Sequence, residues 1–330
     1  MTFAVISHDA GSSELLCAFI SCHQALASWH IFAFPQSPMA TICEKNSLPF
    51  TPIADAREQL ELLKPDALLF GTGWQEKYER PYVAYCKKYN IPTIAFLDHW
   101  SNFRERFGYP EANWEENCGD FTAVSDEKAL QYATSLNLPY PIALPNMYLQ
   151  NLINQQQHVF ATPNNHLLFL SEPTDAVAQR TYGDKNYWGF TQYSALEDIL
   201  KNFDHFGCTG LTIRLHPSET SSGFKKLLEK YPHIHVQIND ARTVDLTHQL
   251  LSSKMILGFD TMALYIAALL GKPVLSYLPS KNRDFLLPLS PAQQHRSLNT
   301  LKPSHLAPIP VVLGDFGMDF ALFIKTIIKE

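Results

Sequence analysis

The sequence predicts an α/β protein made of two consecutive doubly wound domains, and three observations support this prediction. Short apolar segments alternate with amphipathic helical segments from Phe3 to Leu278, an order typical of parallel sheets covered by helices. The chain has 330 residues, enough for about two domains of ordinary size. A polar stretch at 151–165, rich in Asn and Gln, interrupts the alternation near its middle.

In the first half, runs of apolar residues predict strands, and helix ends are marked by capping residues and by Lys64-Pro65. Ser12 or Ser13 is the expected start of the first helix, and Ser125 or Asp126 is the expected N-cap of a later one. The predicted strands are Phe3–Ser7, Trp29–Phe34, Ala67–Phe70, Thr93–Leu97 and Phe121–Val124, and the predicted helices are Ser12–Gln24, Asp55–Leu63, Glu76–Tyr89 and Glu127–Leu136.

The second half repeats the alternation, which predicts a second sheet of parallel strands. The predicted strands are His166–Leu170, Leu211–Leu215, His235–Ile238, Met255–Gly258 and Val274–Leu278, and the predicted helices are Tyr193–Phe206, Gly223–Tyr231, Val244–Leu251, Thr261–Leu270 and Phe316–Ile328. We expect one domain over 1–160, a second over 161–312, and a terminal helix in 313–330 that packs back toward the first domain. Because open α/β sheets bind ligands beyond the carboxyl ends of their strands, two such halves imply an interdomain cleft.

Composition and charge exclude several classes of function. With 26 basic and 32 acidic residues the formal net charge is -6, so the chain has no general attraction to nucleic acid, and at most a peripheral association with a membrane is expected. The six cysteines show neither a CxxC pair nor zinc spacing with histidine, so no metal is expected. The first residues include Asp9 and Glu14 and no basic leader, which predicts a cytoplasmic protein with reduced, buried thiols.

The segment GLTIRLHPSE at 210–219 is the most informative motif. An apolar strand brings Arg214, His216, Pro217 and Ser218 to its carboxyl end, and Arg214 and His216 leave the same face of the strand. A guanidinium and an imidazole at this place predict a site that holds a phosphate. The alternative is a structural histidine in a turn after a buried strand.

A second anion site is predicted where the strand 255–258 passes into a helix. Asp260 and Thr261 begin that helix, whose unpaired backbone N–H groups and positive dipole end attract anions, with the Thr261 hydroxyl as a further donor. The alternative is that these residues serve only as a helix cap.

Residues 166–279 resemble the nucleotide-sugar-binding half of inverting GT-B glycosyltransferases of bacterial surface polysaccharides. The likeness is greatest to CMP-sialic acid and related nonulosonate transferases, and more distant to CDP-glycerol polymerases. Three segments carry it, with Thr261 standing where many relatives have Ser: LLFLSEP at 167–173, RLHPSE at 214–219 and ILGFDTMALYIAALLGKPVLSY at 256–277.

The resemblance implies a GT-B-like fold of two Rossmann-like domains, with the donor bound by the second. It implies that His216 contacts the donor phosphate, that Pro217 shapes the loop and that Thr261 reaches the same phosphate. By the same analogy Ser171 and Glu172 lie near the nucleotide.

Two strand exits in the first half carry groups suited to proton transfer. His8 and Asp9 follow the first strand, and Asp98 and His99 follow the strand 93–97. An inverting transferase needs a base for the acceptor hydroxyl, so Asp9 and Asp98 are the leading candidates, with His8 and His99 as their partners or replacements. The alternative is that these residues form turns and caps.

Together these observations predict a metal-independent inverting glycosyltransferase without a cofactor. Its expected partners are a CMP-activated nonulosonic acid donor and a bacterial glycan or glycoconjugate acceptor. One alternative keeps the fold but makes the protein a sugar-nucleotide 2-epimerase or a CDP-glycerol-type phosphotransferase. The other is a glycan- or nucleotide-binding protein without catalysis.

Overall fold

The chain folds into two α/β units in a computed structural model that describes residues 1–73, 77–155, 161–313 and 319–328. One unit comprises Met1–Leu152 together with Gly314–Glu330, and the other comprises Ile153–Leu313. Each unit is built on its own parallel sheet, of seven strands in the first and six in the second, so the predicted fold class is confirmed.

The first sheet has the strand order β3-β2-β1-β4-β5-β6-β7, and the neighbouring strands pair in parallel. Strands β1, β4 and β5 are buried along almost their whole length, which explains why they are continuous apolar runs rather than alternating ones. The strands are β1 Thr2–Ile6, β2 Ser28–Ala33, β3 Phe50–Pro52, β4 Ala67–Gly71, β5 Thr93–Phe96, β6 Phe121–Val124 and β7 Pro141–Ala143.

The predicted helices of this unit follow their strands, with corrections at their starts, and the helix Pro38–Lys45 was not predicted. Asp9, not Ser12 or Ser13, caps α1, because its carboxylate accepts the Gly11 N–H. Asp126 caps α5, as one of the two predicted alternatives. Glu76, the expected start of the helix before Tyr89, lies outside the described residues, and α4 begins at Arg80. The helices are α1 Ala10–Cys22, α2 Pro38–Lys45, α3 Arg57–Leu63, α4 Arg80–Lys88, α5 Glu127–Ser135, α6 Met147–Gln155 and α12 Phe320–Ile327.

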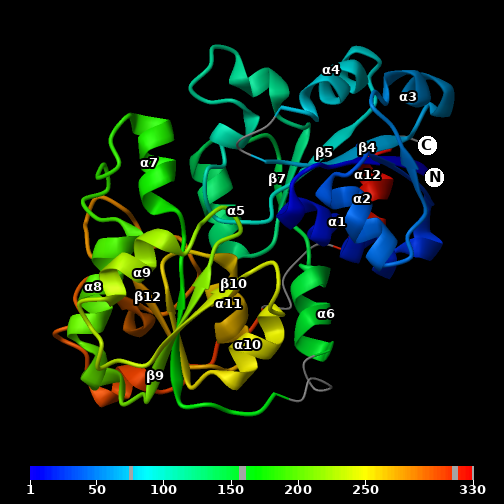
Figure 1. The fold of residues 1–330 in the computed structure, drawn as a ribbon. Coiled ribbons are helices and arrows are strands. Elements are labelled where there is room, and N and C mark those ends of the chain that lie inside the picture. The colour runs from blue at the N-terminus through cyan, green and yellow to red at the C-terminus, as the bar shows by residue number, and fades with distance from the viewer. Residues whose placement is uncertain (74–76, 156–160, 314–318, 329–330) are drawn as a thin grey trace. The chain divides into compact units, whose positions relative to one another are not determined.

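The terminal helix α12 packs into the core of the first unit (Figure 1). Phe320 meets the ring of Phe19 in α1 edge-on, with 4.6 Å between ring centroids. Phe323 and Ile324 are also buried in this core. The last turns of the chain therefore stabilise the sheet that contains its first strand.

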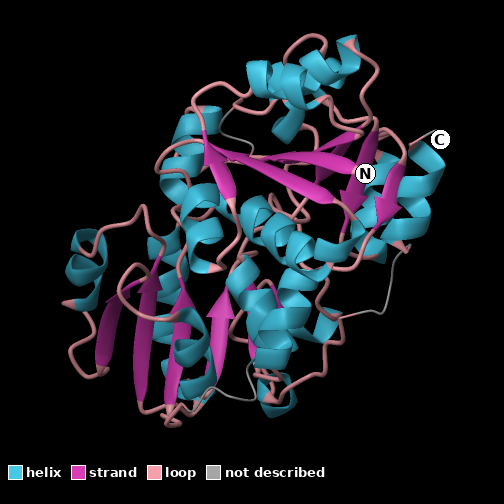
Figure 2. Cartoon of the chain, turned by 90° about the vertical axis from the view of Figure 1, so that its right-hand side faces the viewer, coloured by secondary structure: helices cyan, strands magenta, loops and turns pink. Residues whose placement is uncertain are grey.

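The second sheet has the order β10-β9-β8-β11-β12-β13, and Figure 2 shows its strands running in one direction. Its first five strands therefore have the same spatial order as the first five of the other sheet. The strands are β8 His166–Leu170, β9 Gly210–Leu215, β10 Val236–Asp240, β11 Met255–Gly258, β12 Val274–Tyr277 and β13 Gln294–His295. The helices are α7 Thr174–Tyr182, α8 Gln192–Lys201, α9 Ser222–Leu228, α10 Leu246–Ser252 and α11 Met262–Leu269.

Two general properties follow from the described residues. None of the helices within them combines the length and apolar character needed to cross a bilayer. The six cysteines are free thiols, of which Cys22 is exposed and Cys208 half-buried, so the expectation of buried thiols holds for the other four only.

Candidate functional site

The two sheets each have a place where the strand order reverses, and the predicted site residues cluster there. The chain leaves β1 toward β2 on one side and later enters β4 on the other, and β8 stands in the same relation to β9 and β11. In open α/β sheets in general, ligands bind beyond the carboxyl ends of the strands at such a point. His8 and Asp9 follow β1, and Ser171 and Glu172 follow β8.

Asp9 and Asp98 come together at the carboxyl ends of the strands of the first sheet, a region called the first edge below. The Asp9 carboxylate accepts the Gly11 N–H at 3.1 Å at the start of α1. Burial raises the pKa of Asp9, the negative charge of Asp98 raises it further, and the positive charge of Arg106 opposes both. An ideal Cβ on Gly11 would lie 2.0 Å from Asp98 Oδ2, so only glycine lets that carboxylate lie against the first turn of α1.

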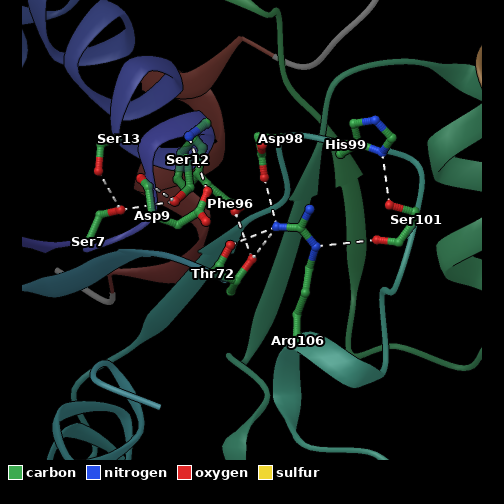
Figure 3. A network of polar contacts seen from close by, with 11 residues as sticks. Ser7, Asp9, Ser12, Ser13, Thr72, Phe96, Asp98, His99, Ser101 and Arg106 are labelled. Atoms are coloured by element: carbon green, nitrogen blue, oxygen red, sulfur yellow. Dashed lines mark hydrogen bonds and ion pairs between the residues drawn. The ribbon is translucent and has the colours of Figure 1, made fainter. Parts of the chain in front are cut away.

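Asp98 is paired with a buried arginine. Arg106 Nη1 donates to Asp98 Oδ1 at 2.7 Å and to the carbonyl oxygen of Thr72 at 2.6 Å, and Arg106 Nε donates to the carbonyl oxygen of Ser101 (Figure 3). The side chain of Arg106 is 6% exposed and that of Asp98 16%. The pair thus connects the loops after β4 and β5 and neutralises one of the two carboxylates.

His8 has a partner that the sequence did not indicate. Glu79 Oε1 lies 2.6 Å from His8 Nδ1 and also accepts the backbone N–H of His8 at 2.9 Å. Glu79 lies more than 70 residues away along the chain, just before α4, so no local spacing connected it with His8.

The other predicted groups at this edge have local partners. His99 Nδ1 lies 2.9 Å from the Ser101 hydroxyl (Figure 3). Trp100, beside it, is buried and donates its indole N–H to the Asp126 carboxylate.

At the carboxyl ends of the strands of the second sheet, called the second edge below, Glu219 joins the loops after β8 and β9. Its carboxylate accepts the Ser171 hydroxyl at 2.9 Å and the backbone N–H of His216 at 2.8 Å. Burial raises the pKa of Glu219 to about 7, against these two hydrogen bonds and with help from the negative charges of Glu172 and Asp175. Glu219 lies within the motif at 210–219, but nothing in the local sequence indicates that it joins two loops.

The hydrogen bonds of His216 define which ring nitrogen carries a proton. Its Nδ1 accepts the backbone N–H of Ser218 at 3.2 Å and lies 2.8 Å from the Ser218 hydroxyl. A backbone N–H only donates, so Nδ1 is an acceptor and the proton of the neutral ring is on Nε2. Partial removal from water lowers the pKa of His216, which favours this neutral form. Pro217, between the two, is exposed.

Glu172 and Asp260 share a half-buried arginine, Arg283, that the sequence did not indicate. Glu172 accepts the Asp260 backbone N–H at 3.0 Å and pairs with Arg283 Nη2 at 3.0 Å. Arg283 Nε lies 3.7 Å from Asp260 Oδ2, and its guanidinium lies over the ring of Trp188. Arg283 falls in an irregular segment after β12, where no periodicity marks an inward-facing residue.

The remaining predicted residues have structural contacts of their own. Thr261 is the N-cap of α11, and its hydroxyl accepts the Ala263 N–H. Arg214 donates to the carbonyl oxygens of Val244 and Ala241 and to Gln249, and thereby fixes the connection after β10. Strand β8, which is followed by Glu172, lies between β9 and β11. The convergence of His216 and Thr261 on one anion therefore stays a prediction, and a phosphate contact of Arg214 stays one as well.

In the described ranges, no three His, Cys, Asp or Glu side chains are grouped to hold a metal ion.

Comparison with known sequences gives no match, either to a family model or to a curated protein. Comparison with solved structures gives matches over most of the chain. UDP-GlcNAc 2-epimerase from Neisseria meningitidis, solved with UDP-GlcNAc bound, has a TM-score of 0.60 at 14% identity and covers 84% of this chain and 82% of its own. UDP-GlcNAc 2-epimerase from Methanocaldococcus jannaschii has a TM-score of 0.55 at 14% identity, covering 84% and 83%.

The Anabaena protein HepE in complex with UDP-glucose also matches, with a TM-score of 0.55 at 10% identity over 84% of this chain and 80% of its own. At such identities the matches establish the fold, which is GT-B-like, as the motif resemblance implied. The structures named here contain or are named for UDP-sugars, so they give no support to the more specific expectation of a CMP-nonulosonate donor.

Proposed function

We propose that this protein acts on a nucleotide sugar. In this proposal the edge of the second sheet binds the nucleotide phosphates, through His216 Nε2–H and the start of α11, and the edge of the first sheet supplies the proton-transfer groups. The neutral tautomer of His216 supports the first part, because it presents an N–H donor to an anion without requiring a charged ring.

The reaction we propose is 2-epimerisation of a UDP-sugar. Inverting C2 breaks the C2–H bond, whose electron pair forms a C1–C2 double bond while UDP leaves C1 with the electrons of the C1–O bond. A proton then returns to C2 from the other face and UDP adds back to C1. The reaction needs a base, an acid and a stabilised leaving phosphate.

One observation carries this choice over simple transfer: the first edge contains two separate proton-transfer groups. One is His8 with Glu79, and the other is Asp9, whose raised pKa suits a carboxyl that holds a proton. Transfer to an acceptor hydroxyl requires only one such group. The fold shared with UDP-GlcNAc 2-epimerases over 84% of the chain supports the same choice.

The test is incubation of the purified protein with UDP-GlcNAc in D₂O, followed by proton NMR. We expect a second UDP-sugar to form without any acceptor, with deuterium at C2 of both sugars. His216→Ala should weaken UDP binding, measured by calorimetry, about 10-fold or more. As a matched control, His233→Ala, on an exposed turn of the same unit, should leave UDP binding unchanged. Absence of both exchange and epimer would contradict the proposal.

Inverting glycosyl transfer is the second candidate, favoured by the motifs at 167–173, 214–219 and 256–277 and by the fold shared with HepE. It predicts that UDP or CMP is released from a nucleotide sugar only when an acceptor glycan is added. Binding of UDP and CMP without exchange, epimer or release over a panel of acceptors would instead indicate a non-catalytic binding protein.

A further inference from the structure

Glu79 is placed to control His8 rather than to cap a helix. It occupies the N-cap position of α4, yet its side chain makes no capping hydrogen bond. One oxygen of its carboxylate, Oε1, instead receives both the backbone N–H and the Nδ1 position of His8, at 2.9 and 2.6 Å. A carboxylate that accepts two hydrogen bonds from one residue fixes both the backbone and the ring of that residue.

The contact determines the chemistry of the imidazole. A carboxylate oxygen accepts hydrogen bonds, so Nδ1 of His8 carries a proton and donates it to Glu79. In the neutral ring Nε2 is then the basic nitrogen, and the negative charge of Glu79 stabilises the imidazolium that forms when Nε2 takes up a proton. The His8 and Glu79 side chains are 11% and 7% exposed, so water screens the interaction only weakly.

The surroundings of Nε2 are shaped by a glycine. An ideal Cβ on Gly73, after β4, would lie 3.0 Å from Nε2 and 3.2 Å from the Cβ of Asp9. Such contacts are tighter than most side chains tolerate, so a side chain at position 73 would crowd the basic nitrogen. Among the described residues, those that face the ring include Glu79, Tyr78, whose ring centroid lies 5.0 Å away, and Asp9 through its carboxylate.

The carboxylates of this edge are less suited to act as the base. Asp98 is paired with Arg106, so one of its carboxylate oxygens is already engaged by a guanidinium 2.7 Å away. Asp9 caps α1, and burial favours its protonated form. We infer that His8 is the base that removes the proton from the substrate sugar and that Glu79 is its positioning residue. This inference rests on the proposed function, and it selects His8 as the base from the four candidates His8, Asp9, Asp98 and His99.

The test measures C2 deuterium exchange on UDP-GlcNAc for four variants. We expect His8→Gln to lower kcat by about 100-fold or more and Glu79→Gln to lower it by about 10- to 100-fold, with KM changed less than about twofold. Glu79→Asp, which retains the charge, should recover part of the loss. His30→Gln, a matched change at a histidine of β2, should retain full activity.

Three further measurements separate positioning from general damage. In Glu79→Gln the acidic limb of the kcat/KM profile should move to lower pH, because the charge that stabilises the imidazolium is gone. Gly73→Ala should lower kcat while leaving UDP affinity unchanged, since the added methyl crowds Nε2. Nitrogen-15 NMR of the ligand-free protein should show the Nδ1–H tautomer of His8 in the wild type.

The outcomes distinguish this inference from the proposed function. Exchange that survives His8→Gln unchanged would overturn the role of His8 but leave the epimerase proposal intact. A profile that does not move in Glu79→Gln, or a ring that NMR shows as the Nε2–H tautomer or as an imidazolium at pH 8, would overturn the role of Glu79. A wild-type protein that binds UDP yet neither exchanges nor epimerises the sugar would remove the proposed function, and the base role of His8 with it.

Discussion

His8 in the first unit and His216 in the second occupy comparable positions but receive opposite hydrogen-bonding roles. Each follows a strand at the carboxyl edge of a parallel sheet, and each donates its backbone N–H to a glutamate, Glu79 at 2.9 Å and Glu219 at 2.8 Å. Glu79 also contacts the His8 ring, which makes Nδ1 a donor. The His216 ring instead accepts from Ser218 through Nδ1.

This difference shows that residue type and position do not define the chemistry of a histidine. If the hydrogen-bond partner of Nδ1 is an acceptor, Nε2 of the neutral ring can take up a proton. If that partner is a donor, Nε2 carries the proton and donates a hydrogen bond. The first edge is therefore suited to proton transfer and the second to anion binding. The proposed function depends on this difference.

The charged groups that support the two edges also differ. At the first edge Asp98 is held by the guanidinium of Arg106, 2.7 Å away. The second edge has a comparable pair in Glu172 and Arg283, and in addition Glu219, whose pKa is raised to about 7. Substitutions at these groups test whether the two edges differ in this way.

The largest effect is expected at Arg106. Arg106→Met leaves the Asp98 carboxylate nearly buried without its partner, which should cost the first unit about 3 kcal/mol or more of its free energy of unfolding. Hydrogen exchange of the β4 and β5 amides measures this loss. Adding Asp98→Asn to Arg106→Met should recover part of it, because no unpaired charge remains.

The control is Arg57→Met, which removes an exposed pair with Asp55 and should give no measurable change. A loss below about 1 kcal/mol in Arg106→Met would show that the first edge does not depend on a fixed charge pair.

A smaller effect is expected from pH at the second edge. The folded protein raises the pKa of Glu219 from 4.5 to about 7, so between these values the folded state binds more protons than the unfolded state. The contribution of Glu219 to stability is therefore present below about pH 4.5 and is lost as the pH rises to about 7, by up to about 3 kcal/mol. Urea unfolding at pH 5 and pH 8 measures this change.

Glu219→Gln should remove this part of the pH dependence, whereas Glu229→Gln, an exposed glutamate after α9, should retain it. If wild type and Glu219→Gln lose the same stability between the two pH values, the carboxyl does not titrate in this range and the contrast between the edges disappears.

The smallest effect is expected at Thr261. Its hydroxyl caps α11 through a single hydrogen bond of 3.4 Å, so Thr261→Ala should cost about 1 kcal/mol or less and Thr261→Ser should cost almost nothing. Urea unfolding checks the stability, and UDP calorimetry checks the site. A loss of UDP affinity in Thr261→Ala that Thr261→Ser restores would support a phosphate contact, while unchanged affinity in both would limit Thr261 to the cap.

The elements that the sequence predicted are those with a strong local signal. Strands β1, β4, β8, β9 and β11 were predicted within about one residue, because a strand buried on both faces must be apolar throughout. The edge strands β3 Phe50–Pro52 and β13 Gln294–His295 were missed, since two or three residues with a polar neighbour or a proline carry no such pattern. The helix α7 was missed as well, because it begins beside Pro173 without a side-chain cap.

The residues of the candidate site likewise fall into those that local sequence predicted and those that it did not. His8, Asp9, Asp98 and His216 follow apolar strands, so their positions at the carboxyl edges were predictable from local sequence. Their partners were not. Glu79 and Arg283 come from segments 71 and 111 residues distant from the groups they bind, and nothing local marks them as inward-facing.

Local sequence signals were enough to predict two parallel sheets and the polar side chains at the ends of their strands, because apolar periodicity and capping act over a few residues. The partner of each imidazole or guanidinium could be identified only in the folded chain. Those pairings depend on strand order and on the close approach of loops at Gly11 and Gly73, and they set the proton positions on which the chemistry depends.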